Sequence, residues 1–123
     1  MNKENTFFLV IGALILAIGL VVVFLCTSRP KEDFTFLTQC LAEKNVTMYG
    51  AAWCSHCQSQ KRAFGEVFSF VPYVECPDNP QVCIAAGIKA YPTWVFPDGT
   101  RVEGELSPAQ LSELSGCPVT ETR

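Results

Sequence analysis

An uncharged apolar run of twenty residues, Phe7–Cys26 (FFLVIGALILAIGLVVVFLC), limits the folds open to this chain. A helix of that length is roughly 30 Å long, which matches the hydrocarbon core of a bilayer. The sequence therefore predicts a transmembrane anchor over residues 7–26, after a short tail at residues 1–6. A cleaved signal peptide is one alternative, but the run is long for a signal core and no small-x-small site follows it. A buried core helix is the other, and it would need apolar partners on every side.

The remainder of the 123-residue chain is long enough for one small domain, predicted over residues 33–117. A polar linker at residues 27–32 precedes it, and a tail at residues 118–123 follows. A net charge of −3, without a basic patch interleaved with aromatic residues, gives no electrostatic case for a nucleic-acid partner. Basic residues lie on both sides of the apolar run, so they do not fix its orientation in a membrane.

Apolar spacing and turn residues predict the order helix, strand, helix, strand, helix, strand, strand, helix in this domain. The first strand–helix–strand unit implies a parallel pair, and a hairpin around Pro97–Gly99 adds an antiparallel one. The fold class is therefore α/β, with a mixed four-stranded sheet flanked by helices. The expected strands are 46–49, 72–75, 93–96 and 101–104. The first expected helix is capped by Asp33 and runs to about Lys44, and the second starts at Cys54 with Phe64, Val67 and Phe68 on one face. The third runs from Asn79-Pro80 to Gly87. The last begins at a Ser107/Gln110 capping box and ends at Gly116.

The pair Cys54 and Cys57, in Trp53-Cys54-Ser55-His56-Cys57, is the candidate reactive centre. A cysteine at a helix N-terminus meets free N–H groups and the positive end of the helix dipole, which favour its thiolate. A second cysteine three residues later lies near the same face and can close a small disulfide ring. Such a pair supports thiol–disulfide exchange, in which a mixed disulfide on Cys54 is resolved by the partner thiol.

His56 lies between the two cysteines in sequence, and an imidazole there can favour the thiolate and make the disulfide more oxidising. The alternative is a surface residue without a role. A C-x-x-C pair can also be half of a zinc site, which Cys76 and Cys83 could in principle complete. The other cysteines are scattered singly and His56 is the only histidine, so we expect neither a metal nor another cofactor.

The remaining cysteines of the domain suggest two structural disulfides. A bond between Cys76 and Cys83 would close a short loop, and one between Cys40 and Cys117 would hold both ends of the domain. Six cysteines allow fifteen connectivities, so both pairings are hypotheses. Either pair could instead relay electrons to Cys54–Cys57. Cys26 is left over, as a plain apolar residue, an acylation site or an intermolecular bridge.

Two motifs resemble those of the thioredoxin superfamily, over about residues 33–117. Trp53-Cys54-x-x-Cys57 resembles the active-site motif, and the segment from Gly87 to Thr93 resembles the loop that ends in the family's cis-proline. The resemblance implies that Pro92 faces Cys54 and helps present the substrate backbone. Pro92 could otherwise be an ordinary residue at the start of a strand.

Within the superfamily, the chain is most similar to the thioredoxin-like domains that work with bacterial vitamin K epoxide reductase homologues. That resemblance implies transfer of electrons from substrate thiols to a membrane quinone reductase. The chain departs from it in having one apolar helix where those proteins have a four-helix domain, so a separate oxidase would be needed. It departs from reducing thioredoxins at Met48, where they carry a buried acid. The resemblance rests on residues 48–58, 72–76, 90–94 and 114–117.

These observations predict a single-pass membrane protein that oxidises cysteine pairs of exported proteins. Seven cysteines in so short a chain favour an oxidising compartment, so the domain is expected on the extracytoplasmic side of the cell membrane. Its expected partners are cysteine-containing proteins and a membrane redox enzyme of the vitamin K epoxide reductase type. The alternatives are a membrane-tethered reductase, for example in cytochrome maturation, a non-catalytic client-binding module and a zinc-binding scaffold.

Overall fold

The computed structural model describes residues 2–27 and 33–120, and the chain divides into two compact units between Glu32 and Asp33. Residues 28–32 of the predicted linker and residues 121–123 of the predicted tail lie outside the described residues. The first unit contains helix α1, and the second contains the sheet and the other helices.

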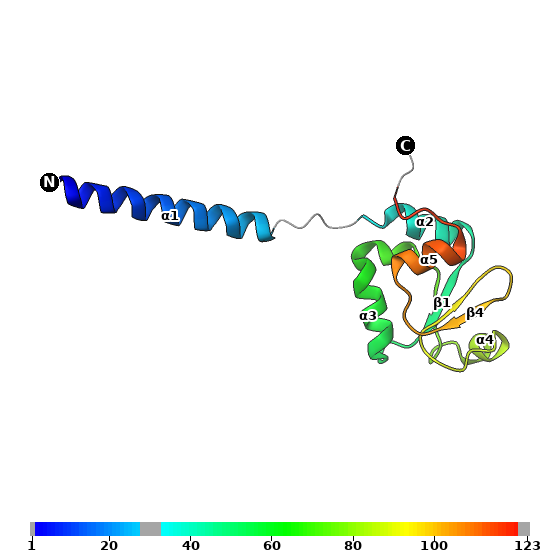
Figure 1. Ribbon diagram of the computed structural model, residues 1–123. Coiled ribbons are helices and arrows are strands. Elements are labelled where there is room, and N and C mark those ends of the chain that lie inside the picture. The colour runs from blue at the N-terminus through cyan, green and yellow to red at the C-terminus, as the bar shows by residue number, and fades with distance from the viewer. Residues whose placement is uncertain (1, 28–32, 121–123) are drawn as a thin grey trace. The chain divides into compact units, whose positions relative to one another are not determined.

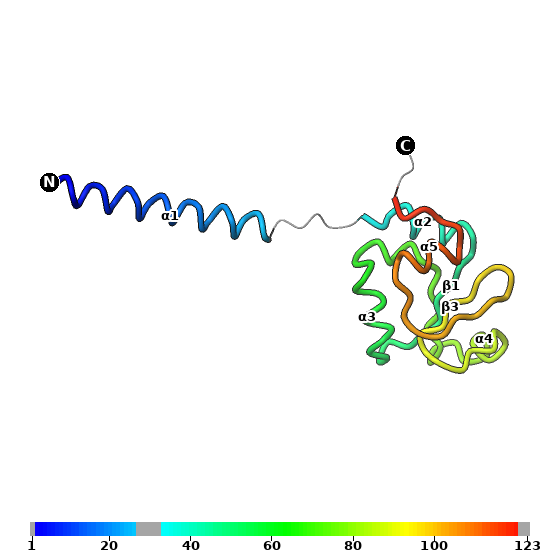
Figure 2. The backbone as a smooth tube through the Cα atoms, viewed as in Figure 1, coloured from blue at the N-terminus to red at the C-terminus, as the bar shows by residue number. Residues whose placement is uncertain are grey.

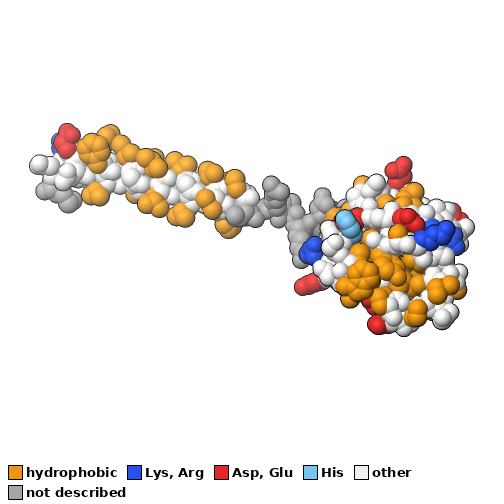
Figure 3. All heavy atoms as spheres, turned by 90° about the horizontal axis from the view of Figure 1, so that it is seen from below, with side chains coloured by type: hydrophobic (Ala, Val, Ile, Leu, Met, Phe, Trp, Pro, Cys, Tyr) orange, Lys and Arg blue, Asp and Glu red, His pale blue; other side chains and the backbone are white. Residues whose placement is uncertain are grey.

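Helix α1 (Lys3–Thr27) is the one described helix that is long and apolar enough to cross a membrane. It begins one turn before Phe7, so part of the expected tail is helical. Its charged residues, Lys3 and Glu4, stand in the first turn, and Figure 3 shows apolar side chains along the remainder. Its length and composition fit a membrane anchor and also a signal sequence near the N-terminus.

The second unit is built on a four-stranded sheet in the order β2-β1-β3-β4. Strand β1 pairs parallel to β2 and antiparallel to β3, and β3 pairs antiparallel to β4. The traces of β1 and β3 lie together in the middle of the unit (Figure 2). The predicted α/β class and mixed sheet are confirmed. The strands are β1 (Thr47–Gly50), β2 (Tyr73–Glu75), β3 (Thr93–Val95) and β4 (Arg101–Glu103).

Helices flank this sheet (Figure 1). The last one ends as the sequence predicts: Ser107 and Gln110 form a reciprocal capping box, and Gly116 closes the helix in the left-handed region at φ 69°. The helices are α2 (Thr35–Glu43), α3 (Ser55–Phe64), the 3-10 helix η1 (Gly65–Phe70), α4 (Pro80–Ala85) and α5 (Pro108–Ser115).

The prediction of one continuous helix from Cys54 through Phe68 is wrong. Helix α3 ends at Phe64, because Gly65 adopts φ 62° and ψ −138°, a conformation open essentially to glycine alone. The chain continues as η1, which still buries Phe68 against the core.

Two expected caps also differ. Residue Phe34, rather than Asp33, is the N-cap of α2, although the Asp33 carboxylate accepts the Thr35 N–H at 2.9 Å. The Asn79 side chain does not cap α4; its amide donates to the Glu75 carbonyl at 3.0 Å.

The core lies between the central strands and the helices. Its fully buried side chains include Trp94 on β3, Met48 on β1, Leu37 and Leu41 on α2, and Leu111 on α5. Strands β1 and β3 are the two inner strands of the sheet, so they fix the positions of Gly50, where β1 ends, and of Thr93, where β3 begins. Both points border the candidate site described below.

The described residues form two disulfides, and they are the pairs that the sequence favoured. Cys40 on α2 is bonded to Cys117 just after α5, with 5.8 Å between the Cα atoms. Cys76 after β2 is bonded to Cys83 on α4, with 5.7 Å between the Cα atoms. The first bond therefore joins the two ends of the domain, and the second attaches a short helix to the sheet.

Candidate active site

Cys54 occupies the N-cap of α3, where β1 has ended at Gly50 and a short turn reverses the chain. Its Sγ accepts the backbone N–H of Cys57 at 3.3 Å. An N-cap side chain normally satisfies one of the free N–H groups at the start of a helix, and here sulfur does so. The hydrogen bond and the helix dipole both stabilise negative charge on this sulfur.

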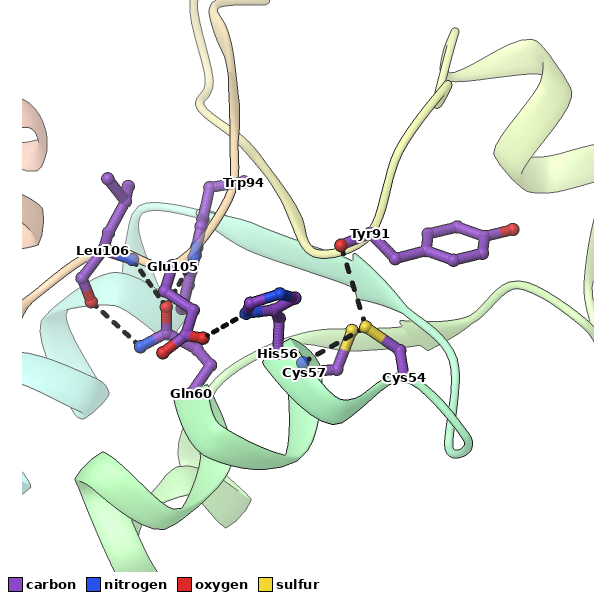
Figure 4. Close-up of polar contacts among 8 residues, drawn as sticks. All are labelled: Cys54, His56, Cys57, Gln60, Tyr91, Trp94, Glu105 and Leu106. Carbon is purple, nitrogen blue, oxygen red and sulfur yellow. Dashed lines mark hydrogen bonds and ion pairs between the residues drawn. The ribbon is translucent and has the colours of Figure 1, made fainter.

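The two thiols differ in burial and in proton affinity. Both are free, but Cys54 keeps 7% of its surface exposed whereas Cys57 keeps none. Burial, followed by the hydrogen bond with Cys54, raises the pKa of Cys57 to about 11. Cys54 is therefore the one of the two that presents any surface to a reactant, while Cys57 stays a protonated thiol at neutral pH. Figure 4 shows the two sulfurs together at the start of the helix.

The loop before β3 brings Tyr91 and Pro92 to Cys54 from far along the chain. The Tyr91–Pro92 peptide bond is cis, as the resemblance implied, and Pro92 is buried. The Cys54 thiol donates to the Tyr91 carbonyl at 3.7 Å. The Trp53 side chain is 73% exposed, and its ring meets that of Tyr91 edge to face at 6.0 Å. Exposed apolar surface thus lies beside the accessible sulfur.

His56 is paired with a residue that the sequence did not single out. Its Nδ1 lies 2.7 Å from Oε1 of Glu105, in the loop after β4. The hydrogen bond from His56 lowers the pKa of the Glu105 carboxyl. The imidazole is turned toward this carboxylate (Figure 4), so any effect of His56 on the sulfurs is shared with Glu105.

Gln60 fixes the direction of α3, and it too was missed. It is 1% exposed, and its side chain bridges three elements. Its Nε2 donates to the Leu106 carbonyl at 2.9 Å, and its Oε1 accepts from the Leu106 N–H and the Trp94 indole. An amide three residues after Cys57, on the inner face of a helix, is the sequence signal that could have found it.

The zinc alternative loses its remaining ligands. Cys76 and Cys83 are bonded to each other, and a disulfide sulfur is not a thiolate ligand. Within residues 2–27 and 33–120, no group of three or more His, Cys, Asp or Glu side chains is placed to hold a metal ion.

No protein-family model matches the chain. It is 42% identical over 78 residues to the thiol-disulfide oxidoreductase LTO1 of Arabidopsis thaliana, a match that covers 56% of this chain and 20% of that protein. The chain thus spans about a fifth of that relative. Among solved structures it is similar to chloroplastic thioredoxin z, with a TM-score of 0.48 and 24% identity, over 65% of this chain and 84% of the other.

Proposed function

We propose that this chain is a thiol–disulfide oxidoreductase whose redox pair is Cys54 and Cys57. One observation carries the proposal: an accessible sulfur receives a backbone N–H at the start of α3, and a fully buried thiol stands one turn behind it. The 42% identity over 78 residues to a protein named for this activity supports it.

The proposed reaction on a client is an exchange of one disulfide. A client thiolate attacks Sγ of Cys54 in the oxidised pair, the Cys54–Cys57 bond breaks, and Cys57 leaves and takes up a proton. The second thiolate of the client then attacks the client sulfur that is bonded to Cys54. This forms the client disulfide and releases Cys54 as a thiolate. The client gains one disulfide and loses two electrons, which the Cys54–Cys57 pair receives.

We assign the oxidising direction from two features of the domain. Met48 is buried on β1 where reducing thioredoxins carry an acid, so the usual helper for ionising the second cysteine is missing. The disulfides Cys40–Cys117 and Cys76–Cys83 also persist best in an oxidising compartment. Re-oxidation of Cys54–Cys57 then falls to a separate membrane enzyme, for which a quinone reductase of the vitamin K epoxide reductase type is our candidate.

The direction is tested by the reduction potential of Cys54–Cys57, measured on the full chain in detergent by equilibration with glutathione. We expect a value above about −200 mV, in the range of thiol oxidants. A value near −270 mV, that of thioredoxin, would reverse the assigned direction and favour a tethered reductase. Formation of disulfides in a reduced cysteine-containing protein, at substoichiometric amounts of the chain, provides the matching rate measurement.

Helix α1 is the proposed single-pass anchor, with the redox domain on the extracytoplasmic side. Support comes from its length, its apolar composition and the absence of charge after its first turn. We expect the expressed chain to stay in the membrane fraction through an alkaline carbonate wash, with its N-terminal residues still attached. Release by the wash, or a mature chain beginning after Cys26, would overturn the anchor.

A further inference from the structure

In the proposed cycle Cys57 must act as a nucleophile when the Cys54–Cys57 pair is re-oxidised, although its thiol is protonated at rest. When Cys54 attacks the disulfide of the re-oxidising partner, the mixed disulfide must be resolved by Cys57, and only its thiolate attacks. Burial holds the pKa of Cys57 at about 11, so very little thiolate exists at neutral pH. Strand β1 offers no carboxylate for this step, since the buried position on it is occupied by Met48.

The space around Cys57 is bounded by Gly50 and Tyr73. A Cβ placed on Gly50 would lie 2.8 Å from the Cys57 sulfur and 3.3 Å from the Tyr73 hydroxyl. The sulfur and the tyrosine ring therefore both pack against Gly50 on the same side, in space that any larger residue at this position would fill. The parallel pairing of β1 with β2, with Gly50 opposite Glu75, brings this face of β2 to the cysteine.

The Tyr73 hydroxyl is in turn held by a carboxylate. It donates to Oε2 of Glu75 at 2.6 Å, and the other oxygen of Glu75 accepts the Ala52 N–H at 2.7 Å. The carboxylate is thus fixed between the tyrosine and the turn that leads to Cys54. Burial, and then the hydrogen bond to Glu75, raise the pKa of Tyr73 well above its usual value, so its hydroxyl keeps its proton at rest.

Lys61 completes the set of charged groups. Its Nζ lies 3.6 Å from the centroid of the Tyr73 ring, within the range of a cation–π contact. Its charge lowers the proton affinity of Cys57, against the larger effect of burial. Among the described residues, the titratable groups around Cys57 are therefore Cys54, Lys61 and Tyr73, with Glu75 behind Tyr73.

We propose that Tyr73 and Glu75 form a proton relay that ionises Cys57 when it resolves a mixed disulfide on Cys54. This relay rests on the proposed function, because it serves the re-oxidation half of that cycle. As resolution begins, the Cys57 thiol comes into hydrogen-bond range of the Tyr73 hydroxyl beside Gly50, and its proton passes to Oη of Tyr73 as the Tyr73 proton passes to the Glu75 carboxylate. The Cys57 sulfur attacks Cys54, the Cys54–Cys57 bond forms, and the bond to the partner sulfur breaks. The partner leaves as a thiolate, and half-buried Glu75 returns the proton to solvent.

The relay is tested with Ellman's reagent, an aromatic disulfide whose released thiolate is coloured, on the reduced full chain in detergent, with Cys26→Ser in every variant because Cys26 is a free, exposed thiol. The first release reports attack by Cys54, and the second reports resolution by Cys57. In Glu75→Gln, which keeps an oxygen for the Ala52 N–H, and in Tyr73→Phe, we expect the second release near pH 7 to slow by about 100-fold, the lower end of general-base effects. The first release should keep its wild-type rate.

The pH profile separates a relay from a packing role. As the pH approaches 11, Cys57 ionises without help, so the variants should approach the wild-type rate of the second release. Glu103→Gln, which changes an exposed carboxylate on β4, is the matched control and should behave as wild type. An unchanged second release in Glu75→Gln would overturn the relay, whether or not Tyr73→Phe is slow. Failure of the first release in the wild type would instead overturn the proposed function.

Discussion

Replacement of Cys57 by serine is expected to trap client proteins on Cys54 as stable mixed disulfides. Cys54 is the one of the two sulfurs that presents any surface to a reactant, so the first bond still forms when the reduced variant meets an oxidised client. Release by the buried second thiol is removed, because a serine hydroxyl does not displace a disulfide sulfur. The adduct should appear on a non-reducing gel and disappear on reduction, and turnover should fall to the uncatalysed background, because residues that act as a unit lose nearly all catalysis when one of them is removed.

Two matched variants make this result specific. Cys54→Ser should form no adduct and lose turnover equally, since Cys57 is fully buried. Cys26→Ser, which changes the remaining free cysteine in α1, should keep both wild-type turnover and the absence of a trapped adduct. Undiminished exchange in Cys54→Ser would mean that the reaction does not pass through Cys54, and the proposal of Cys54–Cys57 as the redox pair would be wrong.

The sequence predicted the parts of this fold that depend on neighbours in the chain. The helix that starts at Cys54 follows from a cysteine at a cap position, and the last helix follows from the Ser107 and Gln110 capping box. The parallel pair followed from the strand–helix–strand unit and the antiparallel pair β3–β4 from the hairpin, whereas the pairing of β1 with β3 was not predicted. The break after Phe64 was missed, because apolar spacing continued through Phe68 while the backbone depended on Gly65 alone.

The supporting residues of the site could not be predicted in the same way. Tyr73 and Glu75 are two apart on a strand, so they share a face, but that this face meets Cys57 depends on the register of β1 and β2. Glu105 reaches His56 from 49 residues away through a loop with no pattern of its own. These contacts exist only after the sheet has paired, which is why the reactive cysteines were evident from the sequence and their surroundings were not.

Removal of the Cys40–Cys117 disulfide is expected to cost much more stability than removal of Cys76–Cys83. The first closes a loop with a sequence separation of 77 residues, the second one of 7. In the chain-entropy model the first disulfide raises the free energy of unfolding by about 4.5 kcal/mol and the second by about 2 kcal/mol. The difference arises because the longer cross-link restricts more of the unfolded chain. Alanine is the suitable replacement, since Cys117 is buried and a serine hydroxyl there would need a partner.

Denaturant unfolding of the Cys40→Ala/Cys117→Ala and Cys76→Ala/Cys83→Ala double variants measures the difference. Fluorescence of the buried Trp94 indole is a suitable probe, because exposed Trp53 changes its environment less on unfolding.

The same variants separate structural bonds from electron relays. A structural bond predicts wild-type thiol exchange at Cys54 wherever the variant is still folded, as neither pair touches Cys54 or Cys57. Equal losses of stability would contradict the loop-length argument, and loss of exchange in a folded variant would make that pair part of the redox path.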